Sequence, residues 1–186
     1  MKYKISDLPF RVFLDTTVVQ SLMTFGEYIY DNYLSEELEA KLDKLSGKMK
    51  KDIEALRMIF GPVARSPLEL LVSSLSLYEL SKTGEPIKKE QLRVWCFELL
   101  EYDMEALGHS LKSLGPDQEL LGSDYLPHKI DRLLIGECKR SGCKAFITTD
   151  YETILKHKKR LQKEGIDALS PSELWSLLQP WWSLWV

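Results

Sequence analysis

Short apolar runs alternate along this chain with longer stretches in which hydrophobic residues recur every three or four positions. Four of the runs have the length and composition of buried strands, at residues 11–15, 68–72, 145–150 and 166–169. Helical spacing occurs at residues 16–29, 75–81, 92–100, 127–140 and 151–164. A further helix is expected after Ser170, which fits a capping box with Glu173. Strands that alternate with helices predict an α/β fold in which a central, mainly parallel sheet carries helices on both faces.

Residues 30–62 lengthen the interval between the first two strands. Their hydrophobic positions have the spacing of an amphipathic helix, which is interrupted at Ser46 and Gly47. We therefore expect a helical insertion within a single domain that covers residues 1–179. A chain of 186 residues with 44% hydrophobic content suits one core, and no break in composition divides it.

Tryptophan is concentrated at the end of the chain. Residues 180–186 form a short tail that contains Trp181, Trp182 and Trp185. Because tryptophan is favoured both in cores and at interfaces, two alternatives stay open. The tail packs on its own domain, or it forms a protein interface, for example in a homodimer.

The cysteines and the start of the chain bear on localisation. Cys96, Cys138 and Cys143 are odd in number and lack the paired short spacing of a zinc site, so neither a disulfide framework nor a zinc module is indicated. The first residues contain no apolar stretch of signal-peptide length, and no segment reaches the roughly 18 apolar residues that span a bilayer. We expect a cytoplasmic protein without a membrane segment.

The net charge of -3 conceals a basic run shortly after Asp150. The run includes Lys156, Lys158, Lys159 and Arg160. Such a run can hold the backbone of a nucleic acid, or it can be a solvated helix face, and composition alone does not decide between them.

Four acidic residues are the candidates for chemistry. Asp15 and Asp150 close two of the apolar runs, whereas Glu79 and Asp131 lie in the helical stretches. Ligands bind at the carboxyl ends of strands in open α/β sheets, and carboxylates are the ligands that Mg²⁺ and Mn²⁺ favour. Each residue also has a structural explanation, such as a helix cap for Glu79 or a first-turn charge for Asp150.

The acidic residues and their neighbours resemble the motifs of PIN-domain nucleases. The similar segments cover residues 12–18, 76–80, 131–138, 146–152 and 166–178. They occur in the order found in that family and span nearly the whole chain outside the insertion and the tail. The resemblance implies a three-layer α/β/α PIN-like fold with an inserted helical segment.

The resemblance also implies an Mg²⁺- or Mn²⁺-dependent endoribonuclease that hydrolyses single-stranded RNA. Asp15 and Asp150 would be the principal metal ligands, Asp131 a ligand or a base that orients water, and Glu79 an outer ligand. The accessory positions are Thr16, Thr148 and Glu152. Many family members are toxins that a small antitoxin protein neutralises, so such a partner is also implied. The inserted residues 30–62 are a departure from a compact toxin.

Two other functions remain possible at this stage. One is a catalytically silent PIN-like scaffold that binds RNA or a protein. The other is a haloacid-dehalogenase-like phosphotransferase with Asp15 as a covalent nucleophile. That second class needs an acid two residues later, where this chain has Thr17.

Overall fold

The computed structural model describes residues 5–60, 68–80 and 124–184. The predicted helix at 92–100, Cys96, the end of the insertion and the last two residues of the tail lie outside these ranges. Among the described residues, no helix has both the length and the apolar composition needed to cross a membrane.

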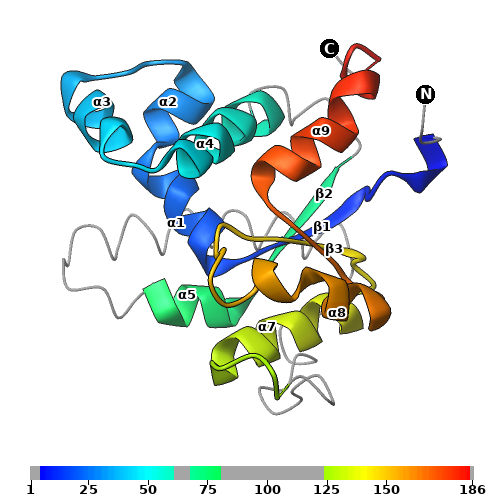
Figure 1. Cartoon of the computed structure of the whole chain (residues 1–186). Helices are drawn as coiled ribbons and strands as arrows, with labels where there is room; N and C mark the ends of the chain where they lie inside the picture. Colours follow the sequence, from blue (N-terminus) through cyan, green and yellow to red (C-terminus); the bar gives the residue numbers. More distant parts are fainter. Residues whose placement is uncertain (1–4, 61–67, 81–123, 185–186) are drawn as a thin grey trace.

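The described strands form one parallel sheet in the order β2-β1-β3-β4 (Figure 1). Their bounds are Arg11–Leu14 for β1, Glu69–Val72 for β2, Ala145–Ile147 for β3 and Asp167–Leu169 for β4. β1 pairs with a strand on each side, and both of its faces are covered, so its inner residues are apolar at consecutive positions rather than at alternate ones. The predicted α/β class and the parallel sheet are confirmed.

Alternate residues of each strand point to opposite sides of this sheet, and helices cover both of its faces. Val12 and Leu14 pack in one core cluster with helices α1, α2, α4 and α9, which span Thr16–Thr24, Gly26–Asp31, Gly47–Phe60 and Pro171–Trp182. Phe13 and Phe146 stack on the other face, with ring centroids 5.7 Å apart. That face is covered by α7 and α8, which span Lys129–Arg140 and Lys158–Lys163 (Figure 1).

The insertion folds as helices, with the predicted interruption. α3 spans Glu36–Asp43, and α4 begins at Gly47. α4 lies against α2 and α9 and contributes Ile53 and Leu56 to the core. The inserted segment is therefore part of the main domain rather than an appendage.

Two predicted helices are shorter or divided. The helix predicted at 16–29 is split at Phe25 into α1 and α2, and α2 ends where Asn32 adopts a left-handed backbone with φ of 54°. Residues 151–154 form a turn, followed by the 3₁₀ helix Leu155–His157 and then α8. The turn forms because the Asp150 carboxylate accepts hydrogen bonds from the backbone of the next residues.

The final helix begins as the sequence predicts. Ser170 and Glu173 form the capping box, and Pro171 occupies the first turn. α9 continues through Trp182, which is buried. The Trp182 ring lies edge-on to the Trp175 ring, with 5.4 Å between their centroids. Trp182 therefore packs on its own domain, whereas Pro180, Ser183 and Leu184 of the Trp-rich tail are exposed.

Candidate active site

The site lies at the carboxyl end of the central strand. Asp15 follows β1 directly, and its backbone N–H donates to the Ile147 carbonyl on β3 at 2.9 Å. Strands β2 and β3 flank β1, so the segments after all three strands meet at this edge. They bring α5, which spans Ser74–Leu80, and the loop at Thr148 towards Asp15.

Asp15 is a buried carboxylate, with 3% of the residue exposed. Its Oδ2 accepts hydrogen bonds from the hydroxyls of Thr148 at 2.6 Å and Thr17 at 2.7 Å. Burial raises the pKa of Asp15, although these hydrogen bonds oppose the shift. Among the described residues, no cationic side chain forms an ion pair with this carboxylate.

Glu79 is connected to the same strand end. The Thr16 hydroxyl donates to Glu79 Oε2 at 2.9 Å and lies 3.0 Å from the buried Ser76 hydroxyl. Thr16 directly follows Asp15, so this contact places α5 beside the buried carboxylate. The hydrogen bond between Thr16 and Ser76 is therefore a polar contact between α1 and α5.

Asp150 and Asp131 are linked by a third threonine. The Thr153 hydroxyl donates to Asp150 Oδ2 and lies 3.5 Å from Asp131 Oδ2. Asp150 Oδ1 accepts from the backbone N–H groups of Glu152 at 3.0 Å and Thr153 at 2.7 Å. Asp150 thus has the turn-stabilising role that its sequence position allows, in addition to its place beside Asp131.

The negative charges of the other three carboxylates all act on Asp131. Burial raises the pKa of Asp131 to about 6, and the negative charge of Asp15 adds to the shift, followed by smaller effects of Asp150 and Glu79. His128 acts in the opposite direction. The fold therefore brings together the four predicted acidic residues from four separate segments.

These carboxylates are nevertheless not arranged as a ready-made set of ligands around one ion. Within the described ranges, no three side chains of Asp, Glu, His or Cys are placed to hold one metal ion. Asp15 and Asp150 instead direct oxygens towards threonine hydroxyls.

The remaining predicted residues divide into those that reach the site and those that do not. Thr16 and Thr148 bond to site carboxylates, whereas exposed Glu152 contacts Asp150 through its backbone. In the basic run, Lys158 pairs with Glu173, and the Arg160 guanidinium lies 4.0 Å from the centroid of Tyr125. Lys156 and Lys159 are exposed.

Sequence reasoning missed Thr17 and Thr153. Thr17 donates to Asp15, and its hydroxyl accepts from the Thr149 backbone N–H at 3.1 Å. A signal was present, because each threonine follows a strand-end aspartate by two or three positions, where a hydroxyl can reach back to the carboxylate. The site is therefore a network of carboxylates and threonines.

The raised pKa of Asp131 leads to a prediction about stability. Between about pH 4 and pH 6 the folded protein retains a proton that the unfolded chain has already lost, so the free energy of unfolding should fall as pH rises. Asp131→Asn should remove about 1 kcal/mol of this fall, because Asp131 is partly exposed and solvent screening weakens the effect of its raised pKa. Urea denaturation in EDTA at pH 4.5 and pH 7 measures the difference between the two proteins. An identical pH dependence in both would contradict the prediction.

Comparison of the chain with known proteins finds no matching family model, no matching curated protein and no matching solved structure.

Proposed function

We propose that this protein is a PIN-like endoribonuclease that hydrolyses single-stranded RNA with the help of Mg²⁺ or Mn²⁺. The observation that carries the proposal is Asp15, a buried carboxylate beside three more acidic side chains and without a cationic partner among the described residues. A buried, unpaired charge costs several kcal/mol in most settings. A bound divalent cation would offset that cost.

The chemistry of the donors fits such an ion. Asp15, Asp150, Asp131 and Glu79 offer hard oxygen atoms, and Mg²⁺ and Mn²⁺ prefer these to imidazole or thiolate. Asp15 and Asp150 would be the main ligands, with Glu79 further out. A divalent cation bound there would supply a water molecule of lowered pKa and neutralise charge on the phosphate.

The side chains of this protein would position the reacting groups. Thr148 and Thr17 hold one Asp15 oxygen, which leaves the other side of the carboxylate free of their hydroxyls. Asp131 has a pKa near that of a base operating at neutral pH, so it can accept a proton from the attacking water. Thr153 keeps Asp131 and Asp150 adjacent.

The test is hydrolysis of labelled single-stranded RNA, with duplex RNA and DNA of the same sequence as comparisons. We expect cleavage of single-stranded RNA in Mn²⁺ or Mg²⁺ and none in EDTA, because no cationic side chain in the described part of the chain pairs with Asp15 and could take the place of the ion. Asp150→Asn, purified in parallel, controls for a contaminating nuclease, whose activity would be equal in both preparations.

Two further measurements separate the ribonuclease from the other two functions. RNA binding without cleavage under every metal condition would favour the silent scaffold. Acid-stable labelling of Asp15 by a phosphoryl donor would favour the phosphotransferase. Membership of a toxin–antitoxin pair would require in addition that a small protein bind the chain and abolish cleavage.

A further inference from the structure

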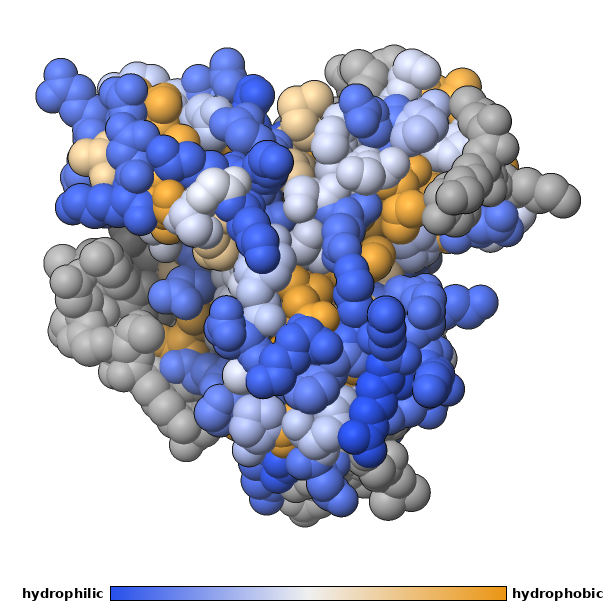
Figure 2. Space-filling view, in the orientation of Figure 1, coloured by the Kyte–Doolittle hydropathy of each residue, from blue (hydrophilic) through white to orange (hydrophobic). Residues whose placement is uncertain are grey.

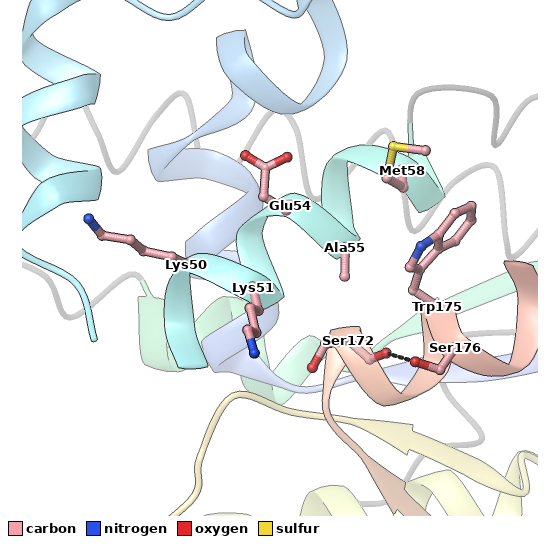
Figure 3. A pocket seen from close by; sticks show the side chains of 8 residues that line it. All are labelled: Lys50, Lys51, Glu54, Ala55, Met58, Ser172, Trp175 and Ser176. Atoms are coloured by element: carbon pink, nitrogen blue, oxygen red, sulfur yellow. Dashed lines mark hydrogen bonds between the residues drawn. The ribbon is translucent and has the colours of Figure 1, made fainter. Parts of the chain in front are cut away.

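A groove lies between the inserted helix α4 and the last helix α9. Its volume is about 350 Å³, within the range of small-ligand pockets, and it is open to solvent. Figure 2 shows this face of the molecule indented between the hydrophilic side chains over α3 and α4 and the paler ones over α9. Lys50, Lys51 and Met58 line it from α4, and Ser172 and Trp175 from α9 (Figure 3).

The groove carries an available positive charge. Lys51 is exposed and extends towards Ser172, and no described residue is bonded to its ammonium group. Lys50 points away from α9 and pairs with Asp43 at 2.8 Å. The one acidic lining residue, Glu54, is bonded to the Tyr28 hydroxyl and to Arg57. An anionic ligand would therefore meet Lys51 rather than a free carboxylate.

The groove also has an aromatic wall. The Trp175 indole faces it beside Met58, and the Trp182 ring makes an edge-on contact with this indole. A partly exposed indole and a lysine that line the same groove supply the two elements that bind single-stranded nucleic acid, a stacking surface for bases and a cation for phosphates. A purely apolar partner would not use Lys51.

A chain of contacts joins the groove to the acidic site. Asp52, which is fully buried in α4, accepts from the Tyr151 hydroxyl at 2.5 Å and from the backbone N–H of Ser172 at 3.0 Å. Tyr151 directly follows Asp150, and the Lys48 ammonium lies 5.2 Å from the centroid of its ring. Lys48, beside Tyr151, and Lys51, in the groove lining, thus lie one turn apart on α4.

We propose that the α4–α9 groove binds nucleotides of single-stranded RNA that extend beyond the acidic site, with a phosphate at Lys51 and a base against Trp175. This inference rests on the proposed ribonuclease function and gives the inserted helix a part in it. The basic run at 156–160 would then be a secondary contact, since two of its cations already have partners within the chain.

The experiment compares two labelled RNAs, of about 4 and about 12 nucleotides, by fluorescence anisotropy at fixed salt. Asp15→Asn serves as the parent so that binding is measured without cleavage. Adding Lys51→Glu should weaken binding of the longer RNA about tenfold and leave the shorter one unchanged, because only the longer RNA reaches the groove. Lys139→Glu, the same change at an exposed position on α7, is the matched control and should alter neither.

A second pair of variants tests the aromatic wall. Trp175→Leu should weaken binding of the longer RNA about fivefold or more, and Trp175→Phe should restore most of it, because phenylalanine keeps a stacking surface. Melting temperatures show whether either Trp175 variant is misfolded. If one is, the RNA affinity of Lys51→Glu, a change at an exposed residue, decides whether the groove binds RNA.

The outcomes separate this inference from the proposed function. If wild type cleaves RNA but Lys51→Glu binds the longer RNA as tightly as its parent, the groove is not the RNA path and the nuclease assignment stands. If the protein neither binds nor cleaves RNA, both fail. If Lys51→Glu weakens binding of both RNAs equally, the change acts through the general charge of the protein. That result would also contradict the proposal that RNA lies in the groove.

Discussion

Replacing Asp15 by asparagine should slow RNA hydrolysis by about 10²- to 10³-fold and, at the same time, raise the melting temperature in EDTA. Activity falls because the principal ligand loses its negative charge. Stability rises because burial raises the pKa of Asp15, which means that the folded protein disfavours the ionised carboxylate present at neutral pH. Activity and stability should therefore change in opposite directions.

The stability gain should be modest. The amide oxygen of asparagine can still accept from Thr148 and Thr17, whose hydroxyls both bond to one carboxylate oxygen. The amide group has one acceptor fewer than a carboxylate, which offsets part of the gain. We expect a net increase of about 1 kcal/mol, or about 2–4 °C in melting temperature for a chain of this size.

Thermal melts with and without Mn²⁺ provide the measurement. Wild type should gain stability from Mn²⁺ by preferential binding to the folded state, and Asp15→Asn should gain much less. Asp167→Asn removes an exposed carboxylate at the start of β4 and is the matched control, with both properties unchanged. A lower melting temperature for Asp15→Asn in EDTA, together with unaltered cleavage, would make Asp15 a structural residue.

Asp52→Ala should produce the largest loss of stability, about 3 kcal/mol. Asp52 is fully buried and accepts from the Tyr151 hydroxyl and the Ser172 N–H, so its removal leaves two partly buried donors without this partner and a small cavity. The loss should also lower activity, because the turn that carries Asp150 would no longer be tied to α4.

Urea denaturation of a short series measures this effect. Tyr151→Phe deletes one of the two donors and should cost about 1 kcal/mol, and Asp52→Asn should fall between Tyr151→Phe and the alanine variant. Lys51→Ala, at the exposed neighbouring position, should stay within about 0.5 kcal/mol of wild type. If Asp52→Ala is as stable as wild type, the buried contact contributes nothing to the placement of the insertion.

The strands and the acidic edge were predictable because local pattern determines them. Three consecutive apolar residues before Asp15 indicate a strand that is buried on both faces, and parallel order brings strand ends together. The break between α3 and α4 was predictable from Ser46 and Gly47. By contrast, the division at Phe25 leaves the hydrophobic spacing intact, so periodicity alone could not reveal it.

Asp52 could not be identified from sequence. It follows Lys50 and Lys51 in a charged helix, where an aspartate is ordinarily solvated. Its burial depends on Tyr151 and Ser172, which lie 99 and 120 residues later in the chain. The same holds for the α4–α9 groove, since its two walls come from segments with no shared local pattern.

The position of β1 between β2 and β3 also affects when the protein can become active during its synthesis. Thr148, which holds the Asp15 carboxylate, lies 133 residues after it and follows β3. A ribosome must therefore translate beyond Asp150, and β3 must emerge and pair with β1, before the four carboxylates can meet. Under the proposed function, a nascent chain that has not yet been translated beyond Asp150 would lack a complete RNA-cleaving centre.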